Sequence, residues 1–267
     1  MRIKNNLFSK SFLFSFVAFA LLATVIITSL YLDETAVDPK NKESNILIGL
    51  SEDNNILSLC VVHLDPKSNS IDFLPIPDNV WIENGVVLQK LYEKRNINNL
   101  ENAIESIIGA KIDRYLVFTV DTIAELNNEM GVFDYQVQYP FVYKNETKAG
   151  YLHIDGNLTK AMFRYQGYDF LNASLSKIGY SYMNTFLSIY TKHNHIQKLT
   201  DIISSNSFLK KAHTNLKKNE MKEYCNILSQ YSTLSQRTLE LSGTYNQASS
   251  STYFIPDNPK SEKNIFK

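Results

Sequence analysis

The sequence predicts an α/β domain in which helices flank a central mixed β-sheet, with an N-terminal transmembrane helix and a helical C-terminal part. Between residues 45 and 165, short β-type runs alternate with helical patterns, the order expected of an α/β sheet. From Phe170 onward the pattern is helical. Residues 11–32 contain no charged side chain, and about 20 apolar residues span a bilayer as a helix.

The apolar segment also predicts where the chain lies. Residues 1–10 are basic, whereas acidic side chains follow the segment from Asp33. This asymmetry places the N-terminus inside the cell. A cleaved signal peptide is the alternative, but the run exceeds the usual roughly 7–15 residues and no Ala-x-Ala site follows it. We therefore expect a cytoplasmic segment at 1–10, a single-pass anchor in the cell membrane at 11–32, a linker at 33–44 and an extracytoplasmic domain.

Composition indicates one globular domain without an overall charge that would favour nucleic acid. The 267 residues include 27 basic and 27 acidic side chains, so no overall field favours nucleic acid. The hydrophobic content of 44% supports one sizeable core. Cys60 and Cys225 lie in apolar or helical patterns and are expected to be unpaired, with a disulfide as the alternative. Arginine, the usual bidentate ligand of phosphate, is scarce.

Three strands are predicted at the centre of the domain: Asn45–Leu50, Ile56–Leu64 and Ile71–Pro77. The second is nearly all apolar, which is typical of a strand buried on both faces. Polar loops at 51–55 and 78–79 follow the first and third strands. Because ligands of α/β sheets bind at such strand ends, we expect the site there.

The remaining elements follow from periodicity and from capping residues. Asn98 or Asn99 is expected to begin one helix and Asp121 to cap the next. Helices are predicted at 98–108, 121–130, 156–165, 170–193, 196–213 and 217–232, and strands at 114–120, 132–139, 141–154 (a hairpin) and 252–255. The domain therefore covers 45–255, and residues 256–267 are expected to be disordered.

Few side chains are candidates for chemistry. Asp53, beside Glu52 in the first polar loop, is a candidate ligand for a hard cation, with a turn residue as the alternative. Asp78 follows the third strand and has the same alternative. The five histidines are isolated or point to different faces, so we expect structural or exposed roles for them.

The order and spacing of several segments resemble the LytR-CpsA-Psr family. Three segments resemble the strands at the start of the family domain: Asn45–Gly49, Val61–Lys67 and Leu74–Asp78, the last standing where the family has Ser-Ile-Pro-Arg-Asp. Two resemble the family's helix–strand join and its next helix: Ile107–Tyr115 and Asp121–Gly131. The others resemble its Asp-Gly segment and its C-terminal helices: Ile154–Gly156 with Ala161–Tyr165, Ala212–Leu216 and Leu239–Gly243. The resemblance covers about residues 45–255.

The resemblance implies a function. Members of that family transfer a phosphorylated glycopolymer from a polyprenyl pyrophosphate carrier to peptidoglycan. Their arginines clamp the pyrophosphate, and their acidic residues act with Mg²⁺. Such chemistry depends on positioned positive charge, which planar guanidinium groups supply to phosphate.

This chain departs from the family pattern at those positions. The family's Arg-x-Asp falls on Asn55-Ile56-Leu57, and its Pro-Arg-Asp falls on Pro77-Asp78-Asn79. Of a pair of arginines after the Asp-Gly, Arg164 remains and the second is Gln166. The next arginine-rich segment, 170–181, contains only Lys177 as a basic residue.

Three hypotheses follow. The first is a non-catalytic, pseudoenzyme-like envelope protein that binds a polyprenyl phosphate lipid or cell-wall glycopolymer, or regulates a true family enzyme, and needs no cofactor. The second is a phosphotransferase that uses Arg164 and Asp78 as catalytic residues and Asp53 with Mg²⁺. The third is an unrelated membrane-anchored domain. For Arg164, an exposed ion pair at a helix end is the structural alternative.

Overall fold

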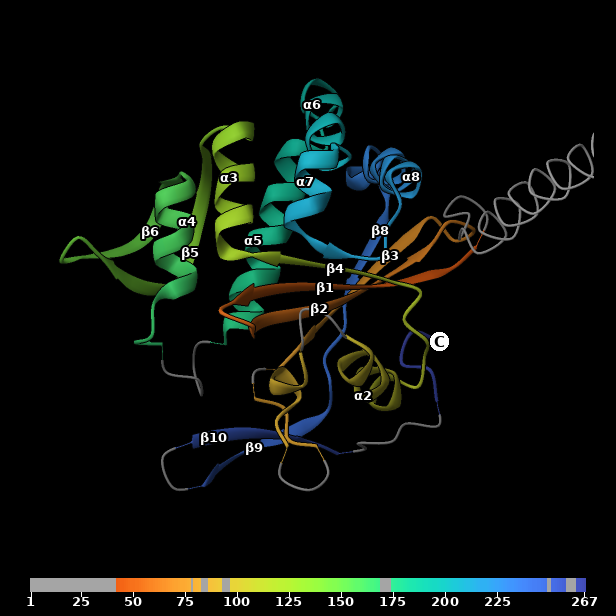
Figure 1. The fold of residues 1–267 in the computed structure, drawn as a ribbon, viewed down its shortest axis with the longest axis vertical. Coiled ribbons are helices and arrows are strands. Elements are labelled where there is room, and N and C mark those ends of the chain that lie inside the picture. Colours follow the sequence, from red (N-terminus) through yellow and green to blue (C-terminus); the bar gives the residue numbers. More distant parts are fainter. Residues whose placement is uncertain are drawn as a thin grey trace, which may run out of the picture. The chain divides into compact units, whose positions relative to one another are not determined.

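A six-stranded mixed sheet forms the centre of the domain (Figure 1). The computed structural model describes residues 42–77, 79–82, 86–92, 97–168, 174–248, 251–257 and 263–267. The strand order is β7-β4-β1-β2-β3-β8, with β1 (Ser44–Glu52), β2 (Asn55–Asp65), β3 (Ser70–Ile76), β4 (Arg114–Thr119), β7 (His213–Thr214) and β8 (Ser235–Thr238). β1, β2 and β3 are antiparallel in turn, and β4 is parallel to β1. The three predicted central strands are confirmed.

A tight hairpin joins β1 to β2. Asp53 and Asn54 form its two-residue loop, and their φ angles are 47° and 64°. Two successive positive φ angles define a type I′ turn, which Asp and Asn tolerate better than most residues. Because β1 and β3 run in the same direction, their polar ends lie at the same end of the sheet, as the sequence predicted.

Helices cover one face of the sheet and a mixed layer covers the other (Figure 1). The first layer contains α3 (Val120–Met130), α5 (Leu175–Tyr190), α6 (His193–Ile203), α7 (Asn206–Lys211) and α8 (Lys218–Leu228). The second contains η2 (Leu88–Leu91), α2 (Asn98–Ile108) and the hairpin of β9 (Gly243–Ala248) and β10 (Ser251–Pro256). β2 is buried along its apolar run because its alternating side chains reach both layers.

A separate two-stranded ribbon packs against α4 (Gly156–Arg164) and α5. β5 (Phe133–Tyr143) and β6 (Glu146–Ile154) form a hairpin whose turn is at the predicted place, but the strand predicted at 132–139 and the first strand of the hairpin predicted at 141–154 are one strand, β5. α4 follows as predicted. Asp155 caps α4 by accepting a hydrogen bond from the Leu158 backbone N–H at 2.8 Å.

Some local predictions are wrong. The helix predicted at 196–213 is two helices, α6 and α7, because Ser205 accepts a hydrogen bond from the Phe208 backbone and begins a new helix. Thr119, not Asp121, caps α3. Asp121 lies in the first turn of that helix instead.

The C-terminal tail is ordered where the structure describes it. At residues 263–267 the prediction of disorder is wrong, because the tail has an apolar anchor. Phe266 is 6% exposed and stacks on His63, with ring centroids 4.8 Å apart. The Ile265 backbone N–H donates to the Ile108 carbonyl at 3.0 Å.

The predicted anchor at 11–32 lies outside the described residues. Within the described ranges, no helix is long and apolar enough to cross a membrane.

A buried ion pair ties the sheet to α8. Arg114 at the start of β4 donates through Nε and Nη2 to Glu220 Oε1, at 3.0 and 2.5 Å. The side chains are 13% and 5% exposed. Glu220 Oε2 also accepts a hydrogen bond from the Lys217 backbone at 2.9 Å, which caps α8. One carboxylate therefore fixes both the ion pair and the helix start.

We expect Arg114→Met to lower the free energy of unfolding by about 3–5 kcal/mol, because it leaves the Glu220 carboxylate buried without its cation. Urea denaturation measures this change. Lys148→Met is the control, because Lys148 pairs with an exposed carboxylate, that of Glu146, and its loss should leave the midpoint nearly unchanged. Equal effects of the two substitutions would contradict a structural role for the buried pair.

Candidate functional site

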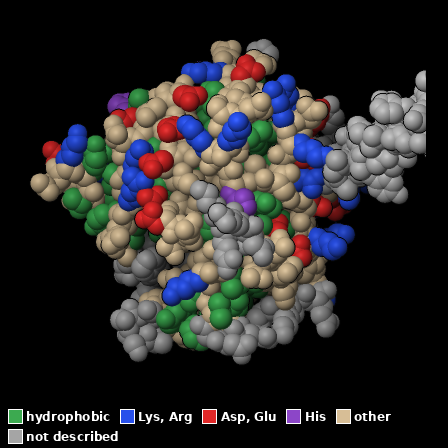
Figure 2. Space-filling view, in the orientation of Figure 1, with side chains coloured by type: hydrophobic (Ala, Val, Ile, Leu, Met, Phe, Trp, Pro, Cys, Tyr) green, Lys and Arg blue, Asp and Glu red, His purple; other side chains and the backbone are tan. Residues whose placement is uncertain are grey.

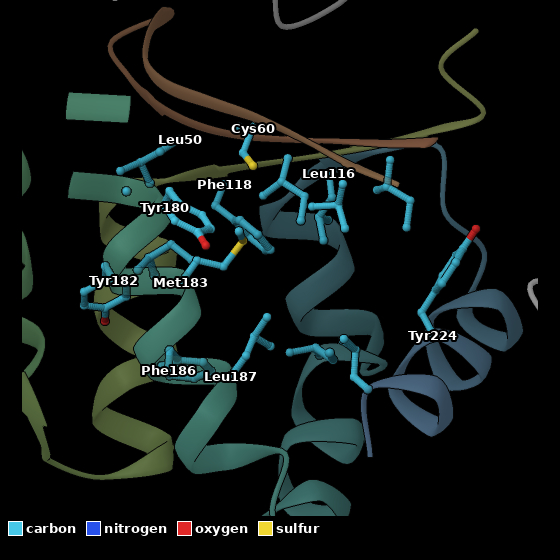
Figure 3. Close-up of a pocket in the computed structure, with 18 of the residues that line it drawn as sticks. Leu50, Cys60, Leu116, Phe118, Tyr180, Tyr182, Met183, Phe186, Leu187 and Tyr224 are labelled. Atoms are coloured by element: carbon cyan, nitrogen blue, oxygen red, sulfur yellow. The ribbon is translucent and has the colours of Figure 1, made fainter. Parts of the chain in front are cut away.

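A cavity of about 200 Å³ lies between the sheet and the helices that cover it (Figure 3). Ile46, Ile48 and Leu50 of β1 face it at every second position, as a strand requires. α5 contributes Tyr180, Met183 and Leu187, and α3, α6 and α8 close the other sides. Apart from Ser58 and the tyrosine hydroxyls, the lining is apolar or sulfur-containing.

An empty cavity of this size lowers the stability of the folded state. Protein interiors are close-packed, and a residual void costs roughly 24 cal/mol per Å³, or about 5 kcal/mol here. Water gains little from a site with so few polar partners. The cavity is therefore suited to an apolar ligand.

Gly179 lets α5 approach the sheet at one side of the cavity. A Cβ atom at this position would lie 2.3 Å from Ser58 Oγ of β2. Ser176, one turn earlier, accepts a hydrogen bond from the Leu59 backbone N–H at 3.4 Å. Small residues of α5 thus fix the helix against the strand.

Both cysteines also line this cavity and are free, so the prediction that they are unpaired is confirmed. Burial raises the pKa of the Cys225 thiol to about 11 and raises that of Cys60 further. Both thiols therefore stay protonated and behave as small apolar groups.

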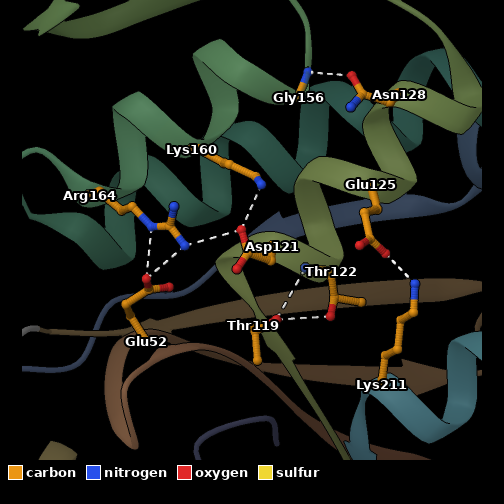
Figure 4. Close-up of polar contacts among 10 residues, drawn as sticks. All are labelled: Glu52, Thr119, Asp121, Thr122, Glu125, Asn128, Gly156, Lys160, Arg164 and Lys211. Atoms are coloured by element: carbon orange, nitrogen blue, oxygen red, sulfur yellow. Dashed lines mark hydrogen bonds and ion pairs between the residues drawn. The ribbon is translucent and has the colours of Figure 1, made fainter.

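A charged network joins the end of β1 to α3 and α4 (Figure 4). Arg164, in the last turn of α4, donates to Glu52 Oε1 at the end of β1 through both Nε and Nη2, each at 2.8 Å. The same Nη2 lies 3.1 Å from Asp121 Oδ1, which is 2.7 Å from Lys160 Nζ. The cavity-lining Phe163 directly precedes Arg164 in the chain.

The docking of α4 on α3 brings this network together. The Gly156 backbone N–H donates to Asn128 Oδ1 at 2.9 Å, and a Cβ atom on Gly156 would lie 2.5 Å from the Ala124 carbonyl oxygen. Lys160 and Arg164 are four residues apart, so they share one face of α4 above the first turn of α3. That spacing was a sequence signal for Lys160, which the sequence prediction missed.

The network is electrically balanced. The hydrogen bond from Lys160 and the charge of Arg164 lower the pKa of the Asp121 carboxyl. Burial opposes the charge on Arg164, but the Glu52 and Asp121 carboxylates raise its pKa on balance. Two cations thus meet two anions, and a phosphate near Arg164 would compete with the Glu52 and Asp121 carboxylates for the guanidinium group.

Of the predicted site residues, the structure describes Arg164 and Asp53, and these two do not line the same pocket. Arg164 is 39% exposed and forms the ion pairs that its structural alternative predicted. Asp78 lies outside the described residues. Asp53 lines a different, polar pocket, whose lining includes neither Arg164 nor its carboxylate partners.

The residues around Arg164 do not fit a resident Mg²⁺ ion. Both carboxylates there are already paired with the cations Arg164 and Lys160. In the described part of the chain, no three His, Cys, Asp or Glu side chains converge to hold a metal. Asp53 as a metal ligand stays a prediction.

On the face shown in Figure 2, basic and acidic side chains of the described residues lie beside one another.

We expect the charged network to stabilise the fold only above the acidic range. A carboxyl whose folded pKa is lowered contributes stability above its unfolded pKa and loses it as the pH falls through the folded value. Asp121→Asn should therefore be less stable than wild type at neutral pH. The difference should shrink once the pH falls past the ordinary aspartate pKa of 3.8 and vanish below the lowered pKa of the folded state. Urea denaturation across this range measures it, and a difference independent of pH would contradict the network.

Comparisons with known proteins bear on this arrangement. No family model matches the chain. The polyisoprenyl-teichoic acid–peptidoglycan teichoic acid transferase TagV of Bacillus subtilis is 25% identical over 255 residues. This alignment covers 85% of the chain but only 64% of the length of TagV, so the chain spans less than two thirds of that relative.

Solved structures share the fold. The crystal structure of B. subtilis TagV matches with a TM-score of 0.69 at 22% identity, covering 82% of this chain and 92% of that one. TagT bound to LI-WTA matches with a TM-score of 0.62 at 14% identity, covering 83% and 87%. The sequence similarity to TagV and the fold shared with TagV and TagT support the resemblance of this chain to the LytR-CpsA-Psr family.

Proposed function

We propose that this protein is a membrane-anchored, extracytoplasmic member of the cell envelope that binds a polyprenyl-linked wall glycopolymer through its lipid chain and does not transfer it. The observation that carries the proposal is an apolar cavity in a chain whose candidate arginine, Arg164, is already paired with two carboxylates. The similarity to TagV supports a glycopolymer role.

The cavity supports the lipid part of the proposal. The name of TagV describes a polyisoprenyl-linked teichoic acid as its substrate. A polyisoprenyl chain is a hydrocarbon, and each buried CH₂ group contributes about 0.8 kcal/mol to binding. Leu50, Met183 and Leu187 offer such a chain an apolar surface from both the sheet and α5.

The charged network argues against transfer. Phosphoryl transfer depends on positive charge held at the transferred group. Arg164 is held by two carboxylates, and the positions of the other expected arginines carry Asn55, Asp78 and Gln166. Each missing arginine–phosphate contact costs about 1.5–3 kcal/mol. Several losses together reduce a rate by orders of magnitude.

Transfer of the glycopolymer to peptidoglycan is the alternative, and the name of TagV favours it. In that reaction Arg164 would act with Asp78, and Asp53 would contribute a metal ligand. There Glu52 would compete with the phosphate for the guanidinium group, because its Oε1 already contacts both Nε and Nη2 of Arg164.

A transfer assay separates the two functions. The full-length chain in nanodiscs is incubated with a polyprenyl-pyrophosphate-linked disaccharide and peptidoglycan, and the label on peptidoglycan is counted. We expect wild type and Arg164→Ala both to give background levels. Transfer by wild type that Arg164→Ala abolishes would overturn the non-catalytic proposal.

We expect Met183→Trp to abolish binding of polyprenyl phosphate, because the larger ring fills the cavity. The melting temperature should not fall by more than a few degrees, since the ring replaces a void. Val142→Trp adds the same ring at an exposed position of the β5–β6 hairpin and is the matched control. Mass spectrometry of lipid retained by the full-length protein measures binding. Equal retention by Met183→Trp and wild type would contradict the proposed lipid site.

A further inference from the structure

A second pocket, of about 270 Å³, lies at the same end of the sheet as the charged network but on the opposite face. Val117 and Thr119 of β4 line it, whereas Leu116 and Phe118 line the apolar cavity. Because strand side chains alternate between faces, the two sites are separated by the sheet itself. The remaining lining residues are Ser51, Asp53, Asn54, Tyr92, Lys211 and His213.

The pocket has a buried base and an exposed rim. Ser51, Tyr92 and Val117 are buried, and Asp53, Asn54 and Lys211 are exposed. The Tyr92 hydroxyl lies 3.2 Å from His213 Nδ1. The ring of His213 also packs edge-on against Tyr115, with centroids 5.1 Å apart. The contacts among Tyr92, His213 and Tyr115 thus hold one side of the pocket in place.

The lining offers hydrogen-bond acceptors and donors in similar measure. Asp53 supplies carboxylate oxygens, and Asn54 supplies both an amide oxygen and an amide NH₂. In the described part of the chain, neither side chain has a hydrogen-bond partner in the fold. Burial raises the pKa of Tyr92, so its phenol stays a donor. The hydroxyls of Ser51 and Thr119 add further partners.

The charge of the pocket is balanced. Lys211 is paired with Glu125 outside the lining, and Asp53 brings a negative charge to the rim. This pattern disfavours a phosphate or another anion. The single carboxylate is too few for a metal site, and the polar rim does not suit a hydrocarbon.

We propose that this pocket binds one neutral saccharide unit. A sugar ring carries hydroxyls that both donate and accept, and its C–H faces pack against aromatic rings and valine. The volume lies just below the roughly 300 Å³ at which pockets for drug-sized ligands begin, which suits a monosaccharide. The inference goes beyond the proposed function, because the saccharide site and the lipid cavity use opposite faces of the sheet.

The test uses the full-length chain in detergent micelles and methyl N-acetyl-β-glucosaminide as the probe, followed by titration calorimetry and saturation-transfer NMR. We expect saturable binding by wild type. Asp53→Asn removes a charged acceptor, and Asn54→Gly removes the amide. Both residues keep the positive φ angles of the turn. Each substitution should weaken binding about tenfold, the size of one charge-assisted or amide hydrogen bond.

Asn145→Gly is the matched control. It makes the same change in the corresponding turn of the β5–β6 hairpin, where Lys144 and Asn145 also have positive φ angles of 51° and 63°. Its saccharide affinity should equal that of wild type. Retention of polyprenyl phosphate should be unchanged in all three variants, so failure of the lipid proposal is detected separately. No binding by wild type, equal binding by all variants, or saturable binding of inorganic phosphate in place of the sugar would overturn the inference.

Discussion

The structure depends on burying β2 on both faces. Ile56–Leu64 is nearly all apolar, and no single layer can cover side chains that alternate between two sides. Leu59 and Val61 therefore pack toward α2, and Cys60 and Val62 pack toward the layer of α5 and α8. The sheet therefore separates the apolar cavity on one face from the polar pocket on the other.

The apolar cavity and the charged network stay separate. Burying an unpaired charge among apolar side chains costs far more than an exposed ion pair returns. Arg164 does not line the cavity; it is 39% exposed and is paired with Glu52 and Asp121. The same pairing leaves little positive charge for a phosphate. A lipid tail is thus favoured inside, whereas a phosphate group near Arg164 competes with two carboxylates.

Local signals account for what could be predicted from sequence. The apolar run of β2, the Asp53-Asn54 turn and the Asp-Gly before α4 each act over a few residues, so their positions were correct within about a turn. Contacts between distant segments were not accessible in this way. Arg164 was identified as a candidate, but its partner Glu52 lies 112 residues away. Phe266 was placed in a disordered tail because its stacking partner, His63, is distant in the chain.

The position of Asp53 shows why strand ends alone do not define a site. Glu52 and Asp53 are adjacent, and the sequence offered them together as one acidic pair. The hairpin turn sends Glu52 to Arg164 and Asp53 to the pocket with Thr119 and His213. Two consecutive residues thus lie in different environments, Glu52 in the charged network and Asp53 in the polar pocket. Because a carboxylate on one face cannot assist a reaction on the other, a mechanism that combined Asp53 with Arg164 would require the β1–β2 turn to open. The type I′ geometry and the paired strands on either side of that turn oppose such opening. The two proposed sites are therefore independent of each other, although they share one sheet.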